Sequence, residues 1–384
     1  MPSSYHNRLC SLWRLLADSR FLWSQQAFYS LNIDWGDTFE TLRKKLLSLS
    51  PDEIDTLEAN PYGVLQWDCR LAKVVREMEE LCRLPVFPVV GNWLVSPHGI
   101  AARKRTQLQA FINVLSPCES VVDWCAGKAH LGRALADNWS STVLALEKDP
   151  HLVEYGLREA KTLDVSYRTV DLQKDVPIVP PQSMICALHA CGSLSDIALD
   201  TALEHHSSLA LSPCCYHKRE HGVWYPKSTA LPKEAQLKKH ELMMPSAWIS
   251  TSRRKRILLR KKALRYRLGL ASFLEENGIE NTRFPSVPRS VFDRSFVEFC
   301  MYMQEKHAVM SPKKPEARWE WVGAERARKV RALGVPRLLF RRAIELLIVL
   351  DASQYLIEAG REVELGVFCP FHVTPRNVMI RTVL

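Results

Sequence analysis

The order of hydrophobic and polar positions changes twice along the chain, and its middle third has the clearest pattern. Short apolar runs occupy residues 120–124, 142–148, 165–172, 183–191 and 207–215. Between most of them lie segments with helix-like spacing, such as the segment that begins at His130 and the one that begins at Pro150. Strands that alternate with helices predict a doubly wound, mostly parallel sheet covered on both faces.

The two flanks of this region have helical patterns instead. Residues 1–95 are predicted to form a helical region rich in tryptophan. Residues 96–384 are predicted to form the sheet domain, interrupted at about 218–335 by a basic helical insertion. The apolar segment 343–360 carries three acidic residues and predicts a core helix rather than a membrane span.

Composition supports a folded protein of a reducing compartment. Of the 384 residues, 47% are hydrophobic and 24% are charged, which is ordinary for a globular protein. The eleven cysteines show no disulfide framework, so we expect buried free thiols. The first residues lack the pattern of a secretory signal, and we expect a cytoplasmic protein without a membrane partner.

Three acidic residues end three successive predicted strands: Asp123, Glu147 and Asp171. The carboxyl ends of parallel strands meet at one edge of a sheet, where ligands bind. An acid about 20 residues after the first turn can accept hydrogen bonds from ribose hydroxyls, and Glu147 holds that position. Asp171 could accept from an adenine amino group. This pattern predicts a nucleoside-containing cofactor.

The turn after the first strand reads DWCAGKA and contains one glycine, Gly127. Cys125 and Ala129 occupy the outer places where glycines would be expected, and a positive φ at either would be costly. The turn lacks the G-x-G-x-x-G pattern that binds a pyrophosphate. This favours a cofactor without phosphates over NAD.

Asp123, Gly127, Lys128, His130 and Leu131 resemble the D-x-G-x-G-K-G-H-L turn of class I S-adenosylmethionine-dependent methyltransferases. The segments LHACGSLSDIAL, SPCCYHK and TPRN narrow this resemblance. They are similar to a subgroup that includes the methyltransferase region of glutathione S-transferase C-terminal-domain-containing protein. More distantly, they resemble the eukaryotic enzyme that 2′-O-methylates position four of tRNA.

The resemblance implies a Rossmann-like α/β fold with seven strands and S-adenosyl-L-methionine as cofactor. It places Asp123, Cys125, Gly127 and Lys128 at the methionine and ribose end of the cofactor. It also assigns Glu147 to the ribose hydroxyls, Asp171 and Leu172 to the adenine, His189 and Cys191 to the transferring methyl, and Cys214 to His217 to the far wall.

Candidate catalytic residues are His189, His217 and Cys214. Either histidine could act as a base, although a structural role for each is as plausible. Cys214 or Cys215 could act as a nucleophile in methylation of a base carbon. No metal site is predicted, but Cys214 and His217 with Cys369 and His372 leave a zinc site open as an alternative to core packing.

The net charge of +10 concentrates in the insertion, where residues 253–267 carry nine lysines and arginines beside an apolar stripe. A second cluster runs from Arg326 to Arg342. We expect RNA to bind through the basic helix 253–267, although a solvated helix face would show the same pattern. The sequence therefore predicts a methyltransferase acting on RNA, either tRNA or rRNA. Alternatives are a methyltransferase for proteins or small molecules, and a non-catalytic nucleic-acid-binding protein with a degenerate Rossmann unit.

Overall fold

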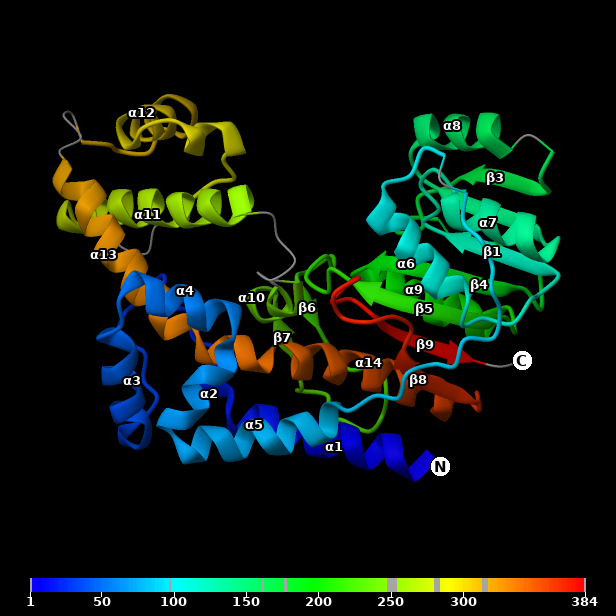
Figure 1. Ribbon diagram of the computed structural model, residues 1–384, viewed down its shortest axis with the longest axis horizontal. Coiled ribbons are helices and arrows are strands. Elements are labelled where there is room, and N and C mark those ends of the chain that lie inside the picture. The colour runs from blue at the N-terminus through cyan, green and yellow to red at the C-terminus, as the bar shows by residue number, and fades with distance from the viewer. Residues whose placement is uncertain are drawn as a thin grey trace. The chain divides into compact units, whose positions relative to one another are not determined.

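The computed structural model describes residues 2–96, 98–160, 162–175, 178–246, 254–279, 284–312 and 317–382. The chain forms two compact units (Figure 1). The first, here called the sheet unit, contains Met1–Ala17, Glu77–Ala247 and Arg341–Leu384. The second, here called the helical unit, contains Asp18–Arg76 and Trp248–Phe340.

A seven-stranded sheet with the order β3-β2-β1-β4-β5-β9-β8 is the centre of the sheet unit. The first five strands are parallel, and β9 is antiparallel to both of its neighbours. The strands are β1 Ser120–Trp124, β2 Thr142–Glu147, β3 Val165–Thr169, β4 Met184–Cys191, β5 Ser208–Cys214, β8 Val363–Val367 and β9 Val378–Thr382. Every apolar run in the middle third therefore forms the strand predicted for it.

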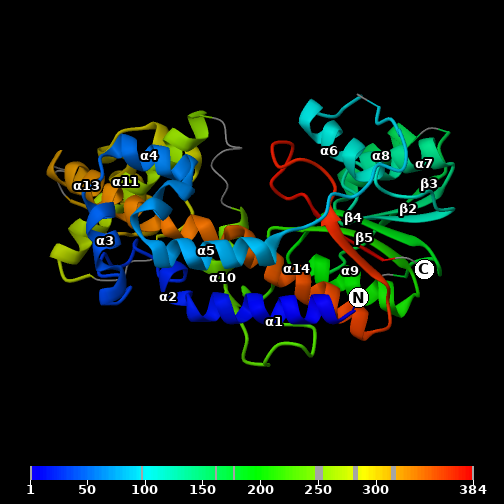
Figure 2. The ribbon, with the colours of Figure 1, turned by 60° about the horizontal axis from the view of Figure 1, so that its bottom comes forward.

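Helices cover both faces of this sheet. In Figure 2, α6 (Ala102–Ile112), α7 (His130–Trp139) and α8 (Pro150–Ala160) lie above the strands, and α9 (Ser193–Glu204) and α14 (Arg341–Glu358) lie below them. The core on the α6–α8 side is built from apolar residues such as Phe111, Leu135 and Val143. This arrangement confirms the predicted Rossmann-like, doubly wound, mostly parallel sheet of seven strands.

The start of α9 carries no capping box, although Ser193 and Asp196 have the spacing of one. Gly192 precedes the helix with a φ of 59°, and no side chain caps its first turn. The Asp196 carboxylate instead accepts a hydrogen bond from Arg219 at 2.8 Å. The acidic side chain is therefore used to hold the segment that follows β5.

Further elements of the sheet unit are short or flank the sheet. They are α1 (Pro2–Asp18), the C-terminal part of α5 (Cys69–Cys82), the ribbon of β6 (Val223–Trp224) and β7 (Leu237–Lys238), α10 (Lys239–Leu242) and the 3₁₀ turn Met244–Ser246. The buried Asp351 carboxylate of α14 accepts hydrogen bonds from the backbone N–H groups of Lys227 and Ser228, at 2.8 and 3.1 Å. These two hydrogen bonds attach the segment that follows β5 to α14 of the sheet unit.

The helical unit is built around the close packing of two helices. A Cβ added to Gly323 of α13 would lie 2.3 Å from the Arg265 carbonyl oxygen of α11, so the two backbones approach closely. Its helices are α2 (Arg20–Trp23), α3 (Glu40–Leu47), α4 (Pro51–Ala59), α11 (Arg254–Glu276), α12 (Phe296–His307) and α13 (Ala317–Gly334), with 3₁₀ turns Asp37–Phe39, Pro61–Trp67, Arg289–Asp293 and Pro336–Phe340. No helix in the described ranges is both long and apolar enough to span a bilayer.

This division differs from the predicted boundaries at residues 95, 218 and 335. Residues 1–17 and 77–95 belong to the sheet unit, whereas 18–76 pack with 248–340. The reason is a set of long-range ion pairs: the Arg331 guanidinium of α13 binds Asp55 and Glu58 of α4, the latter at 2.7 Å. The local order of polar and apolar residues does not indicate which distant residues form ion pairs.

Candidate cofactor site

The turn between β1 and α7 contains three residues in the left-handed region. The φ angles are 56° at Cys125, 58° at Gly127 and 45° at Ala129. Cys125 and Ala129 thus adopt the conformation that glycine would adopt most easily, at a cost of roughly 1–2 kcal/mol each. The Ala126 N–H donates to the Leu146 carbonyl at 2.9 Å and ties the turn to β2. Cys125 and Ala129 therefore hold the left-handed conformation at the two places where glycines would be expected.

Glu147 at the end of β2 faces this turn with a fixed carboxylate. Its Oε2 accepts a hydrogen bond from the Gly127 N–H at 2.8 Å. Its Oε1 accepts from the N–H groups of Lys148 and Asp149, at 2.9 and 3.0 Å. A carboxylate oxygen has two lone-pair sites, so Glu147 retains capacity to accept from a ligand.

A cavity of about 560 Å³ opens at the carboxyl ends of the parallel strands. This volume is in the range of small-molecule sites. Six of the predicted site residues line it: Cys125, Glu147, Asp171, Leu172, Cys191 and His217. The rest of its lining is Leu146, Lys148, Val170, Gln173, Leu194, Lys218, Arg219, Glu220 and Lys239.

Asp123 and Lys128, which the resemblance assigns to the cofactor, are held elsewhere. Asp123 is buried, and its Oδ2 accepts from the Gly132 N–H of α7 at 2.8 Å. Burial raises the pKa of its carboxyl to about 7. The Lys128 ammonium lies over the ring of Tyr155, 4.0 Å from its centroid. Asp123 therefore acts by positioning the start of α7 rather than by lining the cavity.

His189 also lies outside the cavity lining. It occupies a bulge of β4 with a φ of 65°, and its Nε2 is 3.3 Å from Oε1 of Gln107 on α6. Burial lowers its pKa to about 4, so the ring is neutral at pH 7. His217 does line the cavity, and burial lowers its pKa as well. Of the two candidate bases, only His217 faces the site.

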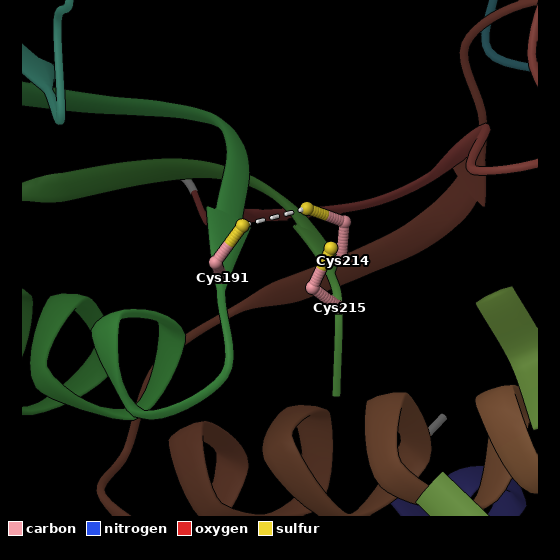
Figure 3. A group of neighbouring side chains, drawn as sticks. All are labelled: Cys191, Cys214 and Cys215. Atoms are coloured by element: carbon pink, nitrogen blue, oxygen red, sulfur yellow. Dashed lines mark hydrogen bonds between the residues drawn. The ribbon is translucent and has the colours of Figure 1, made fainter. Parts of the chain in front are cut away.

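Three thiols meet where β4 and β5 end (Figure 3). The sulfurs of Cys191 and Cys214 are 3.3 Å apart, and Cys214 Sγ donates to the His189 carbonyl at 3.1 Å. Hydrogen bonds among the three thiols raise the pKa of Cys214 and lower that of Cys215, which is also close to the charges of Arg376 and Lys218. Cys214 is buried and its pKa is raised, which argues against the nucleophilic role considered for it.

The alternative zinc site of Cys214 and His217 with Cys369 and His372 does not assemble. Cys369 is buried in the core cluster on the α6 side of the sheet. Among the described residues, the group of cysteines, histidines and acids close enough to share an ion is Cys191, Cys214 and Cys215.

Sequence reasoning missed the basic side chains of the cavity wall, Lys218, Arg219 and Lys239. They come from the segment after β5, which folds back against the end of β4. A Cβ added to Gly192 would lie 2.0 Å from the Lys218 carbonyl oxygen, so the two backbones touch. The glycine before the helix in the LHACGS segment was the available signal for this close approach.

Comparison with known proteins agrees with this geometry. Residues 103–221 match a family model described as a methyltransferase domain. Glutathione S-transferase C-terminal domain-containing protein of Xenopus laevis is 26% identical over 151 residues, which cover 37% of this chain and 24% of that protein. Its homolog of Drosophila pseudoobscura pseudoobscura is 30% identical over 120 residues, covering 30% of this chain and 20% of the relative. The match thus spans about a quarter of the relatives' length or less.

Solved structures with partial similarity are also methyltransferases. Precorrin-6y C5,15-methyltransferase from Geobacter metallireducens GS-15 is 16% identical with a TM-score of 0.23, over 34% of this chain and 72% of that one. Coclaurine N-methyltransferase bound to N-methylheliamine and SAH is 17% identical with a TM-score of 0.27, over 44% and 60%. Residues 103–221 are thus similar to a methyltransferase domain, and they belong to a sheet of the predicted Rossmann-like type.

The free-energy cost of a left-handed residue in this turn can be measured by replacing Gly127 with alanine. A Cβ added there meets no atom within 4 Å, so Gly127→Ala introduces only the cost of a positive φ. We expect the free energy of unfolding to fall by about 1 kcal/mol. Gly334→Ala is the control, because its added Cβ is equally free but its φ is not positive. Urea unfolding in which Gly127→Ala is as stable as the parent would contradict the assigned turn.

Asp123 predicts a pH dependence of stability. Its pKa is about 7 when folded and 3.8 as an isolated side chain, so the folded state binds more protons between these values. Stability contributed by this group therefore falls as pH rises from about 4 to about 7. Asp123→Asn keeps an acceptor for the Gly132 N–H but removes the titration. Its stability relative to the parent should increase over this range, by up to about 4 kcal/mol.

Urea unfolding at several pH values between 4 and 8 measures this difference. Asp137→Asn is the matched control, because it makes the same change at an exposed position of α7, the helix whose start Asp123 positions. A difference for Asp123→Asn that does not change with pH would show that Asp123 is ionised at no cost in the folded protein.

Proposed function

We propose that this domain binds S-adenosyl-L-methionine and transfers its methyl group to RNA. The observation that supports the cofactor is the joint presence of Glu147 and Asp171 in one cavity beside the β1–α7 turn. Glu147 would accept from the ribose hydroxyls, and Asp171 and Leu172 would lie against the adenine. When bound, the cofactor supplies an electrophilic methyl group on a sulfonium with a good leaving group.

The methyl end would then point toward the ends of β4 and β5, where Cys191 and His217 line the cavity. His217 is neutral at pH 7 because its pKa is lowered, so it can accept a proton from the acceptor group. The other residues act by orienting the two reactants, since positioning supplies much of the rate in such a displacement.

An acceptor with a phosphate backbone is supported by the charge around the cavity. Lys148, Lys218 and Lys239 line it and are exposed, and none has an acidic partner within 4.0 Å among the described residues. With Arg219, four cations line the cavity against the three carboxylates of Glu147, Asp171 and Glu220, so its lining is net positive and favours an anionic substrate. This charge lies next to the proposed methyl donor and is the observation that carries the RNA assignment.

The basic helix 253–267 supports the same proposal less strongly than its sequence indicated. Arg253 lies outside the described residues. Arg254, Lys255 and Arg256 are exposed, and we propose them as a second RNA contact. Farther along the helix, two cations form ion pairs within the helical unit: Lys261 binds Asp55 and Arg265 binds Glu320. Four cations of the expected second cluster are also in ion pairs: Arg326 with Glu275, Arg328 with Glu325, Arg331 with Glu58 and Arg342 with Glu345.

Binding of S-adenosylhomocysteine tests the cofactor assignment. Glu147→Gln replaces one carboxylate oxygen by an N–H₂ group, which cannot accept from a ribose hydroxyl and faces backbone N–H donors. We expect binding to weaken by roughly tenfold or more, the effect of losing one hydrogen bond to a charged group. Isothermal titration calorimetry of the full chain measures this. Glu154→Gln, an exposed position on α8, should bind as the parent does. Absence of heat with the parent protein would refute the cofactor, and equal affinity for Glu147→Gln would refute its site.

Salt dependence of tRNA binding tests the acceptor. Replacing Lys148, Lys218 and Lys239 by glutamine should make the plot of log Kobs against log salt concentration shallower by about 2–3. Replacement of Lys233, Lys306 and Arg158, which are exposed elsewhere, removes the same charge and should change the slope little. Calorimetry with S-adenosylhomocysteine checks that the first variant still binds cofactor. A slope near zero for the parent would exclude RNA as the acceptor.

A further inference from the structure

The thiol cluster of Cys191, Cys214 and Cys215 is more than the methyl-transfer proposal requires. The three sulfurs lie within 4.8 Å of one another, at the ends of neighbouring strands. Figure 3 shows the sulfurs of Cys191 and Cys214 turned toward each other across the strand gap, with that of Cys215 beside them. The proposed transfer uses an electrophilic methyl group and a base, and neither role needs three thiols.

The backbone holds these cysteines in place. Cys191 and Cys214 are register partners of β4 and β5, and the Gly192 N–H donates to the Cys214 carbonyl at 3.1 Å. Cys215 has a φ of 45°, a conformation that costs roughly 1–2 kcal/mol for a residue with a side chain. Such strain is found at ligand-binding sites, where the surrounding structure enforces it.

The spacing of the sulfurs fits a tetrahedral metal ion. With zinc–sulfur bonds of about 2.3 Å, two thiolates on one ion lie about 3.8 Å apart. The Cys191–Cys214 distance of 3.3 Å would have to open slightly, and the other pairs, which are no more than 4.8 Å apart, would close by about 1 Å or less. Side-chain rotations suffice for such shifts.

Charge and access also fit an ion. Thiolates are the form that binds metals, and a bound ion displaces the protons of all three thiols. The positive charges of Lys218 and Arg376 act on this cluster and would offset part of the negative charge of three thiolates. Cys191 lines the proposed cofactor cavity, so one side of the cluster faces that space. A disulfide between Cys191 and Cys214 is the rival use of these thiols, but it leaves Cys215 without a role.

We propose that Cys191, Cys214 and Cys215 bind one zinc ion through their three thiolates. The fourth position is left to a water molecule on the cavity side. The ion would join the ends of β4 and β5 and place a Lewis acid beside the methyl-transfer site. This site was not predicted from the sequence, which paired Cys214 with His217 and Cys369.

Metal content of the full chain tests this proposal without reference to activity. The protein is reduced, stripped with a chelator, reconstituted with zinc or cobalt and passed over a desalting column. We expect about one ion per chain, and a cobalt spectrum with a thiolate charge-transfer band and the visible bands of a tetrahedral site. Cys215→Ser is the main variant, because this half-buried position can change without opening the core; it should lose most of the band.

Cys191→Ser and Cys214→Ser should also lose bound metal. Cys118→Ser is the control, because it removes another half-buried thiol of the sheet unit that donates to the Ser120 carbonyl. Circular dichroism verifies that each variant is folded. The proposal is overturned if the reconstituted parent holds no metal, if Cys215→Ser binds as much as the parent, or if peptide mapping finds Cys191 and Cys214 joined as a disulfide in the freshly isolated protein.

Discussion

Five parallel strands that end at one edge of a sheet are the constraint on which the site depends. Because β1 to β4 end side by side, the residues after them must meet, whatever their distance along the chain. Cys125, Glu147, Asp171 and Cys191 come from four different strand ends and line one cavity. The hydrogen bond from the Gly132 N–H to the buried Asp123 then fixes where α7 begins.

This constraint explains which parts of the site were predictable from sequence. Apolar runs mark buried strands, and polar residues at their ends mark the edge, so Glu147 and Asp171 could be assigned without a structure. His189 could not, because a bulge in β4 turns it toward Gln107. Lys239 could not either, since its position depends on the path of residues 218–247, which Asp351 fixes from α14.

The same limit applies to the division of the chain. A charged helix can be recognised locally, but the partners of its charges are distant in sequence. Lys261 and Arg331 share Asp55, which lies more than 200 positions earlier, and these pairs join two segments that sequence analysis separated. Much of the positive charge in the insertion therefore holds the helical unit together, and the free cations beside the cavity become the stronger argument for an anionic acceptor.

The central claim is that a methyl group moves from S-adenosyl-L-methionine to RNA at this cavity. The most direct measurement incubates the full chain with methyl-labelled cofactor and total cell extract, then separates RNA, protein and small molecules. The account predicts that label enters RNA and is released by ribonuclease but not by protease. Label confined to protein or small molecules, or label in no fraction, would contradict it.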